Sequence, residues 1–350
     1  MIRKRAVISA ILSAAGMIIL VLDSKTAIAG ATEGIDICIR TIIPSLLPFF
    51  ILSSLLTSTV AGIKISFLRP IGRLCGIPHG AEYLLLTGFI GGYPVGAQAI
   101  AEAYKSGAIS SQDAKRMLGF CNNAGPAFIF GIAGALFDSK SATLLLWLIH
   151  IASAILVAMI LPRKRTGSCT LVSKPNTPFP TILSNSLRVM AGVCGWVILF
   201  RIIIAFLCRW LLWLFPGPIA LFIIGILELA NGCYNLFETQ SEILRFVISS
   251  VILGFGGICV GMQTVSVTGD LGTGLYFPGK LLQALFSAML SVATALWLFG
   301  RYISTALPVL ILAVLLFIFV IIKKTVAFLD NRVYNNQKER SLCACCFERK

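Results

Sequence analysis

The feature that most constrains this chain is a pair of similar hydrophobic segments, each interrupted by glycine, proline or asparagine. The first spans Gly88–Gly96 (GFIGGYPVG) and is followed by LGFCNNAGP at 118–126. The second spans Gly225–Gly232 (GILELANG) and is followed by LGFGG at 253–257. Gly88 and Gly225 are 137 positions apart, and the two LGF motifs are 135 positions apart, which indicates a degenerate internal repeat. Paired, interrupted segments in matching halves are typical of a transporter binding site.

The composition predicts an integral membrane protein built from helices. Of the 350 residues, 57% are hydrophobic and 12% are charged, whereas soluble domains carry about 25% charged residues. The net charge of +15 does not indicate a nucleic-acid partner, because the basic residues are dispersed at the ends of apolar segments. Cytoplasmic loops of membrane proteins are basic for topological reasons. The expected surroundings are therefore the lipid bilayer, and no separate soluble domain is expected.

The positions of the charges predict a re-entrant hairpin. Three apolar segments lie between the basic loop 64–73 and the basic linker 162–180. If both basic regions are cytoplasmic, one of the three segments must enter and leave on the same side. The segment 83–104, with four glycines and Pro94, is the candidate. The same argument makes 217–238 the hairpin of the second half, so that the two repeats have opposite orientations in the membrane.

The predicted fold is an all-α polytopic membrane protein with two inverted-topology repeats, each containing a re-entrant hairpin and a broken transmembrane helix. The N-terminal segment is expected to be an uncleaved helix or signal anchor, although Ala27-Ile-Ala29 also fits a signal-peptide cleavage site. The expected organisation is an N-terminal segment (1–35), repeat 1 (36–162), a cytoplasmic linker (163–183), repeat 2 (184–322) and a cytoplasmic tail (323–350).

The interruptions in the first half supply candidate ligand contacts. Gly91, Gly92, Tyr93 and Pro94 are expected to form the hairpin tip, because proline disfavours helix at the preceding residue and glycine lets the backbone approach a ligand. A helix restarting after Pro94 would direct its N–H groups into the site. The alternative is a membrane helix kinked by glycines for packing.

Asn122, Asn123 and Gly125 interrupt the next apolar segment. Two adjacent amides in hydrocarbon are costly unless they have partners, and each amide offers both donors and acceptors. These residues are therefore expected to bind a ligand or to support the hairpin. Hydrogen bonding between helices is the alternative.

Glu228, Asn231 and Gly232 occupy the matching place in the second half. An acidic residue within an apolar segment could couple transport to a proton or a sodium ion, or it could form a salt bridge. Gln263 is expected in the second broken span. Arg201 is expected to meet an anionic substrate or to pair with Glu228, unless it extends to the membrane surface.

The remaining polar residues do not suggest an enzyme, a metal site or a cofactor. His150 is expected to be a packing histidine, and Glu82 and Glu102 are expected at the surface. The chain has only two histidines and no nucleophile–base set or metal-ligand motif, which disfavours hydrolytic mechanisms. The spacing of the C-terminal cysteines fits no standard zinc signature, and their role stays open. They are Cys343, Cys345 and Cys346.

Three motifs resemble the YlbJ-type sporulation integral membrane proteins. They are PSLLPFF at 44–50, GFIGGYPVG at 88–96 and FCNNAGPAF at 120–128, and Glu228 with Asn231-Gly232 fits the same pattern. The resemblance implies nucleoside-recognition Gate domains similar to those of concentrative nucleoside transporters. It further implies a role in endospore formation, with export of dipicolinate across the mother-cell-derived outer forespore membrane.

Together, the residues and the resemblance predict a transporter of a small organic anion, most specifically dipicolinate, that works by alternating access. A carrier of nucleosides or other small solutes is the first alternative. A membrane scaffold for spore assembly, without transport, is the second. The coupling ion and a homo-oligomeric state stay open.

Overall fold

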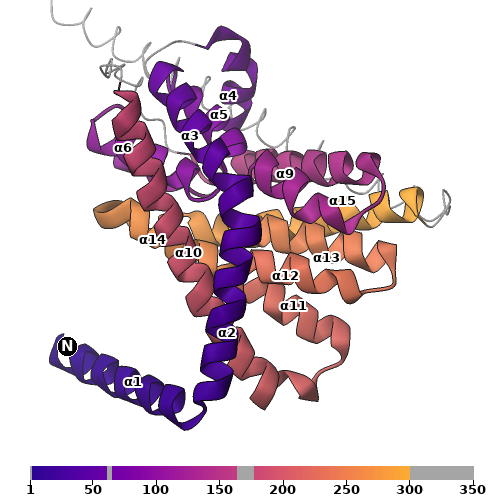
Figure 1. Ribbon diagram of the computed structural model, residues 1–350. Helices are drawn as coiled ribbons and strands as arrows, with labels where there is room; N and C mark the ends of the chain where they lie inside the picture. The colour runs from indigo at the N-terminus through magenta and orange to yellow at the C-terminus, as the bar shows by residue number, and fades with distance from the viewer. Residues whose placement is uncertain (1, 61–64, 164–176, 300–350) are drawn as a thin grey trace, which may run out of the picture.

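The computed structural model describes residues 2–60, 65–163 and 177–299, and every regular element within these ranges is helical (Figure 1). The expected span 303–322 and the tail 323–350, with Cys343, Cys345 and Cys346, lie outside the described residues. Most of the expected linker does so too.

Within the described residues, five helical segments are long and apolar enough to cross a membrane. The prediction of a polytopic helical membrane protein is therefore confirmed. The segments are Ser24–Leu56, Lys140–Ile160 (α9), Phe179–Trp210 (α10), Glu242–Leu271 and Tyr276–Leu298 (α15).

The first of these segments joins α2 (Ser24–Ile37), a π-helical turn (Cys38–Ile42) and α3 (Ile43–Val60). The π turn directly precedes Pro44, whose ring would clash with the carbonyl one turn earlier in a regular α-helix. The N-terminal helix α1 (Ile2–Leu22) ends just before Asp23, whose side chain caps α2.

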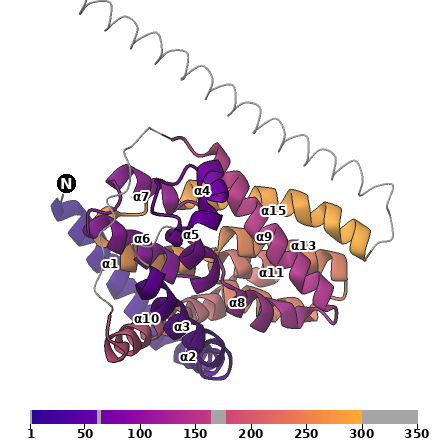
Figure 2. The same cartoon turned by 90° about the horizontal axis from the view of Figure 1, so that it is seen from above.

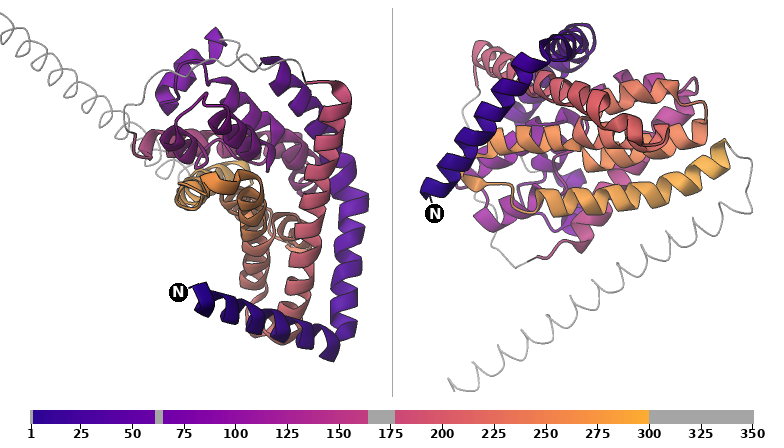
Figure 3. Two further views of the ribbon diagram at one scale, coloured as in Figure 1. Left: turned by 90° about the vertical axis from the view of Figure 1, so that its left-hand side faces the viewer. Right: turned by 90° about the horizontal axis from the view of Figure 1, so that it is seen from below.

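The long helices α2 and α10 run alongside each other, and α1 lies across their end (Figure 3). Glycines in α2 allow this close approach. A Cβ added at Gly30 would lie 2.9 Å from the Cβ of Ala205, and one added at Gly34 would lie 3.0 Å from the Cα of Ile198. Small residues commonly let membrane helices pack this closely.

Both apolar segments of the first half are interrupted where the sequence predicts. The chain runs through α5 (Tyr83–Leu86) and a π-helical turn (Thr87–Gly91), breaks, and resumes as α6 (Val95–Lys105). Gly92 has a φ of 75°, and the Tyr93–Pro94 peptide bond is cis. The next segment forms α7 (Ser111–Met117), a non-helical stretch and then α8 (Pro126–Gly131).

The second half repeats this arrangement. Helices α11 (Gly217–Leu227) and α12 (Leu229–Asn235) are separated at Glu228, which has an extended backbone. Helices α13 (Glu242–Phe255) and α14 (Gly257–Thr268) are separated at Gly256, whose φ of 84° is left-handed. The remaining elements are short: Ser66–Leu68, α4 (Arg69–Cys75), Ala133–Leu136, Leu212–Leu214, Leu236–Glu238 and Gly269–Leu271.

A glycine pair marks the first break in each half. A Cβ added at Gly96 would lie 3.0 Å from the Cα of Gly88, and a Cβ added at Gly232 would overlap the Cα of Gly225. Residues seven or eight apart in a straight helix are separated by about 11 Å or more. The backbone therefore turns sharply at each break, and the two arms meet at glycine.

Helices α9 and α15 pack side by side and run antiparallel (Figure 2). Leu161, after α9, and Leu275, before α15, both lie against Gly119. At the other end, the rings of Phe137, before α9, and Phe299, after α15, stack with centroids 6.4 Å apart. Near the middle of both helices, the Ser287 hydroxyl lies 3.0 Å from that of Ser153.

The glycine contacts predict a large cost for a single methyl group. In Gly88→Ala, the added Cβ would overlap the carbonyl oxygen of Cys121. Because backbone cannot yield as a flexible side chain can, we expect a loss of about 3 kcal/mol of stability, measured as a lower melting temperature in detergent. Gly195→Ala is the control, since a Cβ there meets nothing within 4 Å. Equal melting temperatures for the two variants would contradict the close approach.

Candidate functional site

The four helix breaks meet in the centre of the protein. Gly92 lies against Gly125, since a Cβ added at Gly92 would be 3.1 Å from the amide nitrogen of Gly125. In the second half, a Cβ added at Gly257 would be 3.3 Å from the amide nitrogen of Leu229. The halves also touch, because a Cβ added at Gly256 would be 2.7 Å from the Tyr93 hydroxyl.

Asn122 connects the first break, at Gly92–Pro94 between α5 and α6, to the broken helix pair α13 and α14. Its side chain is fully buried. Its Oδ1 accepts a hydrogen bond from the backbone N–H of Ala97 in the first turn of α6, at 3.2 Å. Its Nδ2 donates to the hydroxyl of Thr264 in α14, at 2.9 Å. The amide therefore satisfies one N–H that the helix start leaves without a partner.

Asn123 is equally buried and holds the non-helical stretch before α8 in place. Its Nδ2 donates to the carbonyl of Phe120 at 2.7 Å. Its Oδ1 accepts from the ammonium or amine nitrogen of Lys280 at 2.9 Å and from Nε2 of Gln283 at 3.1 Å. Both partners belong to α15, so Asn123 connects the two halves.

Lys280 is the central residue that the sequence analysis missed. It is fully buried, and it also donates to Oε1 of Gln283 at 2.7 Å. The available signal was an ionisable residue followed three positions later by an amide in an apolar stretch. The signal is weak because Lys280 lies close to the start of the apolar stretch, where a lysine is usually exposed at a helix end. In the structure, α15 begins at Tyr276.

His150, predicted as a packing histidine, lies in the same centre. Its Nε2 accepts from the backbone N–H of Ala124 at 3.1 Å, and its backbone carbonyl accepts from Gln283 at 3.2 Å. Its Nδ1 is buried and has no hydrogen-bond partner among the residues that the structure describes. The ring is therefore only half satisfied.

Glu228 and Asn231 lie at the break between α11 and α12, which is the second break. The Glu228 carboxylate accepts from the backbone N–H groups of Ala230 and Asn231 at 3.0 and 2.6 Å, and from Nδ2 of Asn231 at 2.6 Å. A carboxylate that caps a helix N-terminus in this way is stabilised by the unpaired N–H groups there. Gly232, the third residue of the predicted set, provides the contact with Gly225 that closes the turn.

Arg201 does not pair with Glu228, as one interpretation of the sequence expected. It forms an ion pair with Glu33 of α2. The physical reason is that α2 packs along α10 and places a carboxylate directly beside the guanidinium. Glu228 meanwhile has three N–H donors of its own, so its charge is already compensated.

Two adjoining cavities reach the helix breaks. The smaller, of about 40 Å³, is lined by Gly91, Gly92, Tyr93, Gly125 and Glu228, among others. The larger, of about 400 Å³, is lined at the break by Pro94 and farther out by Lys105 and Arg188, with Glu102 beside them. Val193 and Gln263 line both cavities. Gln263 is thus at the junction, and its Nε2 donates to Cys259.

Lys105 and Arg188 were not predicted as site residues. Lys105 lies at the end of α6, where a basic residue is common, and Arg188 lies in a part of α10 that has no recognisable motif. Both are exposed. They line the same cavity because α6 and α10, more than 80 residues apart in the chain, both pack against α14. No local pattern in the sequence reports such a contact.

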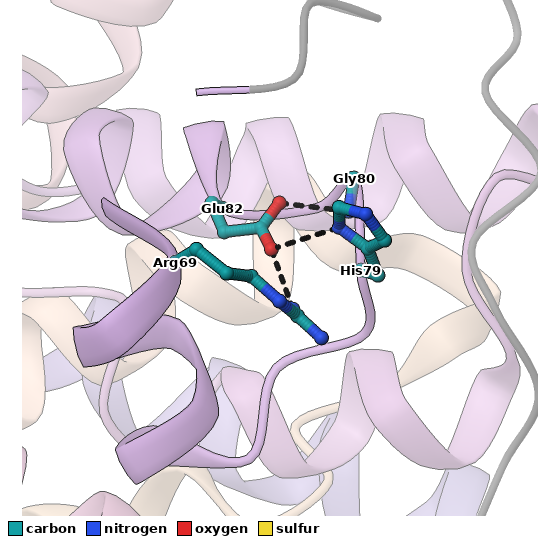
Figure 4. A network of polar contacts seen from close by, with 4 residues as sticks. All are labelled: Arg69, His79, Gly80 and Glu82. Atoms are coloured by element: carbon teal, nitrogen blue, oxygen red, sulfur yellow. Dashed lines mark hydrogen bonds and ion pairs between the residues drawn. The ribbon is translucent and has the colours of Figure 1, made fainter. Parts of the chain in front are cut away.

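Glu82 is buried, contrary to the surface position expected from the sequence. Figure 4 shows its carboxylate between Arg69, His79 and Gly80. It accepts from Nη1 of Arg69 at 2.6 Å and from the backbone N–H of Gly80 at 2.7 Å, and Nδ1 of His79 lies 3.4 Å away. Burial alone would raise the pKa of Glu82, but these hydrogen bonds and the one from its own N–H outweigh burial and lower the pKa.

Comparison with known proteins agrees with the membrane fold. The chain is 27% identical over 306 residues to the sporulation integral membrane protein YlbJ of Bacillus subtilis (strain 168), covering 73% of this chain and 74% of that protein. The chain is a homologue of that protein. No family model matches the chain, and no solved structure matches it. The name of that homologue describes an integral membrane protein of sporulation, and the link to sporulation is one that the interrupted helices by themselves do not supply.

The lowered pKa of Glu82 predicts a pH-dependent contribution to stability. Because the folded pKa lies below the unfolded value, the contribution is complete above the unfolded pKa and is lost as the pH falls through the folded pKa. We expect Glu82→Gln to lower the melting temperature at pH 7, and the difference from wild type to shrink below about pH 4. Glu102→Gln, at an exposed carboxylate, is the control. A difference that does not change with pH would contradict this assignment.

Proposed function

We propose that this protein transports a small organic anion across a membrane by alternating access, and that it acts in endospore formation. The observation that carries the proposal is the meeting of four interrupted helices at a buried polar centre. A uniformly packed membrane scaffold gains nothing from such breaks, since each one leaves backbone groups that must be satisfied away from water. In transporters, discontinuous helices at the interface of two repeats form the substrate site.

Two inverted repeats are part of this proposal, with repeat 1 at 36–162 and repeat 2 at 184–322. Ser153 and Ser287, which contact each other, are 134 positions apart, close to the offsets of 137 and 135 in the interrupted motifs. Contact between equivalent positions is expected where a two-fold axis passes between them. Because α9 and α15 are antiparallel, that axis is perpendicular to them. If both helices cross the membrane, the axis lies in the membrane plane, as an inverted repeat requires.

The cavities support an anionic substrate. The 400 Å³ cavity falls within the usual size range of small-molecule sites. On the way to Pro94 at the first break it has two cationic side chains, Lys105 and Arg188, and one carboxylate, Glu102, so the basic groups outnumber the acidic one. The carboxylate of Glu228 lines the smaller cavity at the second break and disfavours an anion there. The substrate is therefore assigned to the side of the first break.

Dipicolinate, a small planar dianion, is the proposed substrate, and the outer forespore membrane is the proposed location. The support is the homologue's connection to sporulation, together with the resemblance in the interrupted motifs. No catalytic role is proposed. Nucleoside transport and a scaffold role are outcomes that the experiment below distinguishes.

Purified protein in proteoliposomes is expected to take up labelled dipicolinate. Uptake should be saturable and should be inhibited by unlabelled dipicolinate but not by uridine. Inhibition by uridine, together with uridine uptake, would favour the nucleoside carrier. Absence of any transport by folded, correctly inserted protein would contradict the proposal and favour the scaffold.

The two basic residues at the larger cavity predict a change in apparent affinity. In the double variant Lys105→Gln/Arg188→Gln, we expect the KM for dipicolinate to rise about tenfold at low salt, since two favourable charge interactions are lost. The rise should shrink at high salt because exposed charges are screened. Lys140→Gln, at the exposed start of α9, should leave KM unchanged. An unchanged KM in the double variant would place the substrate path elsewhere.

A further inference from the structure

Lys280 is a buried basic residue that has no acidic partner within the part of the chain that the structure describes. Its side chain is fully buried, and its two hydrogen-bond partners in the described chain are the neutral amide oxygens of Asn123 and Gln283. A buried, uncompensated ammonium is very costly, and such groups commonly lose their proton or acquire a counter-charge. An ionisable residue at membrane depth is a functional candidate for the same reason.

The hydrogen bonds around Lys280 match a neutral amine. A neutral amine has two N–H donors, and two amide oxygens accept from Nζ at 2.9 and 2.7 Å. An ammonium has a third N–H, for which the described residues supply no oxygen acceptor. The charged form is nevertheless accessible, because the rings of Tyr93 and Tyr276 lie 5.1 and 5.9 Å from Nζ and can stabilise a cation.

Among the described residues, the titratable groups that face Lys280 do not include a carboxylate. Tyr93 approaches from the first break, Tyr276 from α15 itself, His150 from α9 and Cys121 from the non-helical stretch before α8. None of them is an acid that would be ionised near neutral pH in its ordinary state. A counter-charge for Lys280 must therefore come from outside the described part of the chain.

The smaller cavity lies next to this group. Tyr93, whose ring faces Lys280, lines that cavity, as do Ala124 and Gly125, which directly follow Asn123. The Tyr93 hydroxyl is buried and has no hydrogen-bond partner in the described ranges. Pro94, which directly follows Tyr93, lines the larger cavity. An anion at the Pro94 end of the larger cavity would thus lie next to the residue whose ring faces Lys280.

We propose that Lys280 is the proton-coupling residue: its amine is neutral when the site is empty and takes up one proton when an organic anion binds. The proton adds from water to the lone pair of Nζ, and no bond in the anion is formed or broken. By linkage, the anion promotes protonation and protonation promotes anion binding to the same extent. The inference rests on the proposed transport function and names the proton as the coupling ion.

The first test measures protons directly in the wild-type protein. Isothermal titration of dipicolinate into the full-length protein, in buffers with different ionisation enthalpies, is expected to give uptake of about one proton per anion at neutral pH. In proteoliposomes, dipicolinate uptake should acidify the lumen, as reported by a trapped pH dye. Dipicolinate binding without proton uptake overturns the inference and leaves the proposed function standing. Absence of both binding and transport overturns the two together.

Variants then assign the proton to Lys280. Lys280→Met should bind dipicolinate at least tenfold more weakly and without proton uptake, whereas Lys280→Arg, permanently charged, should bind it without proton uptake. Lys140→Gln should behave as wild type. Proton uptake of the wild-type size in Lys280→Met overturns the inference.

A further pair of variants covers the case in which changes at Lys280 prevent folding. Asn123→Asp keeps the side-chain size and places a carboxylate beside Nζ, so Lys280 should stay charged and proton uptake on binding should fall to near zero. Glu228→Gln removes the acid that is buried at the second break in the wild-type protein, and it should leave proton uptake intact. Loss of proton uptake in Glu228→Gln, with uptake retained in Asn123→Asp, would assign the proton to Glu228 instead.

Discussion

The constraint on which this structure depends is the need to satisfy backbone N–H and C=O groups where membrane helices are broken. The breaks are buried, so the backbone groups freed there need partners within the protein, and at three of the four breaks a buried polar side chain supplies one. In the first half, Asn122 accepts from the start of α6, and Asn123 holds the stretch before α8. In the second half, the Glu228 carboxylate accepts from the start of α12. The first role of the buried amides and the buried acid is therefore structural: they bind the backbone groups that the breaks leave without partners.

The same side chains also connect the two halves of the protein. Asn123 uses its nitrogen for the backbone of its own break and its oxygen for Lys280 and Gln283 of the other half. A movement of α15 would therefore displace the stretch before α8. Binding beside that stretch would in turn change the contacts of Lys280. The two halves also differ in charge, since an amide caps one helix and a carboxylate caps the other. This difference gives the proposed site one side that tolerates an anion and one side that disfavours it.

Much of the fold followed from local sequence features. The breaks at Gly92–Pro94, Glu228 and Gly256 lie in the predicted interrupted segments, because proline and left-handed glycine act on the backbone within a few residues. The site was less predictable. Asn122 and Asn123 were correctly singled out as amides that need partners. The predicted pairing of Arg201 with Glu228 was wrong, and so was the predicted surface position of Glu82. Both outcomes depend on helices that meet only in the folded protein.

The sequence by itself determined the membrane environment, the positions of the apolar segments and the residues at which they break. Hydrophobicity and backbone restriction are properties of a short stretch and need no distant partner. Only the tertiary structure decided which breaks touch, that Lys280 lies against Asn123 at a separation of 157 residues, and that Lys105 and Arg188 line one cavity. These contacts arise from the packing of helices far apart in the chain, for which no local pattern encodes the partner.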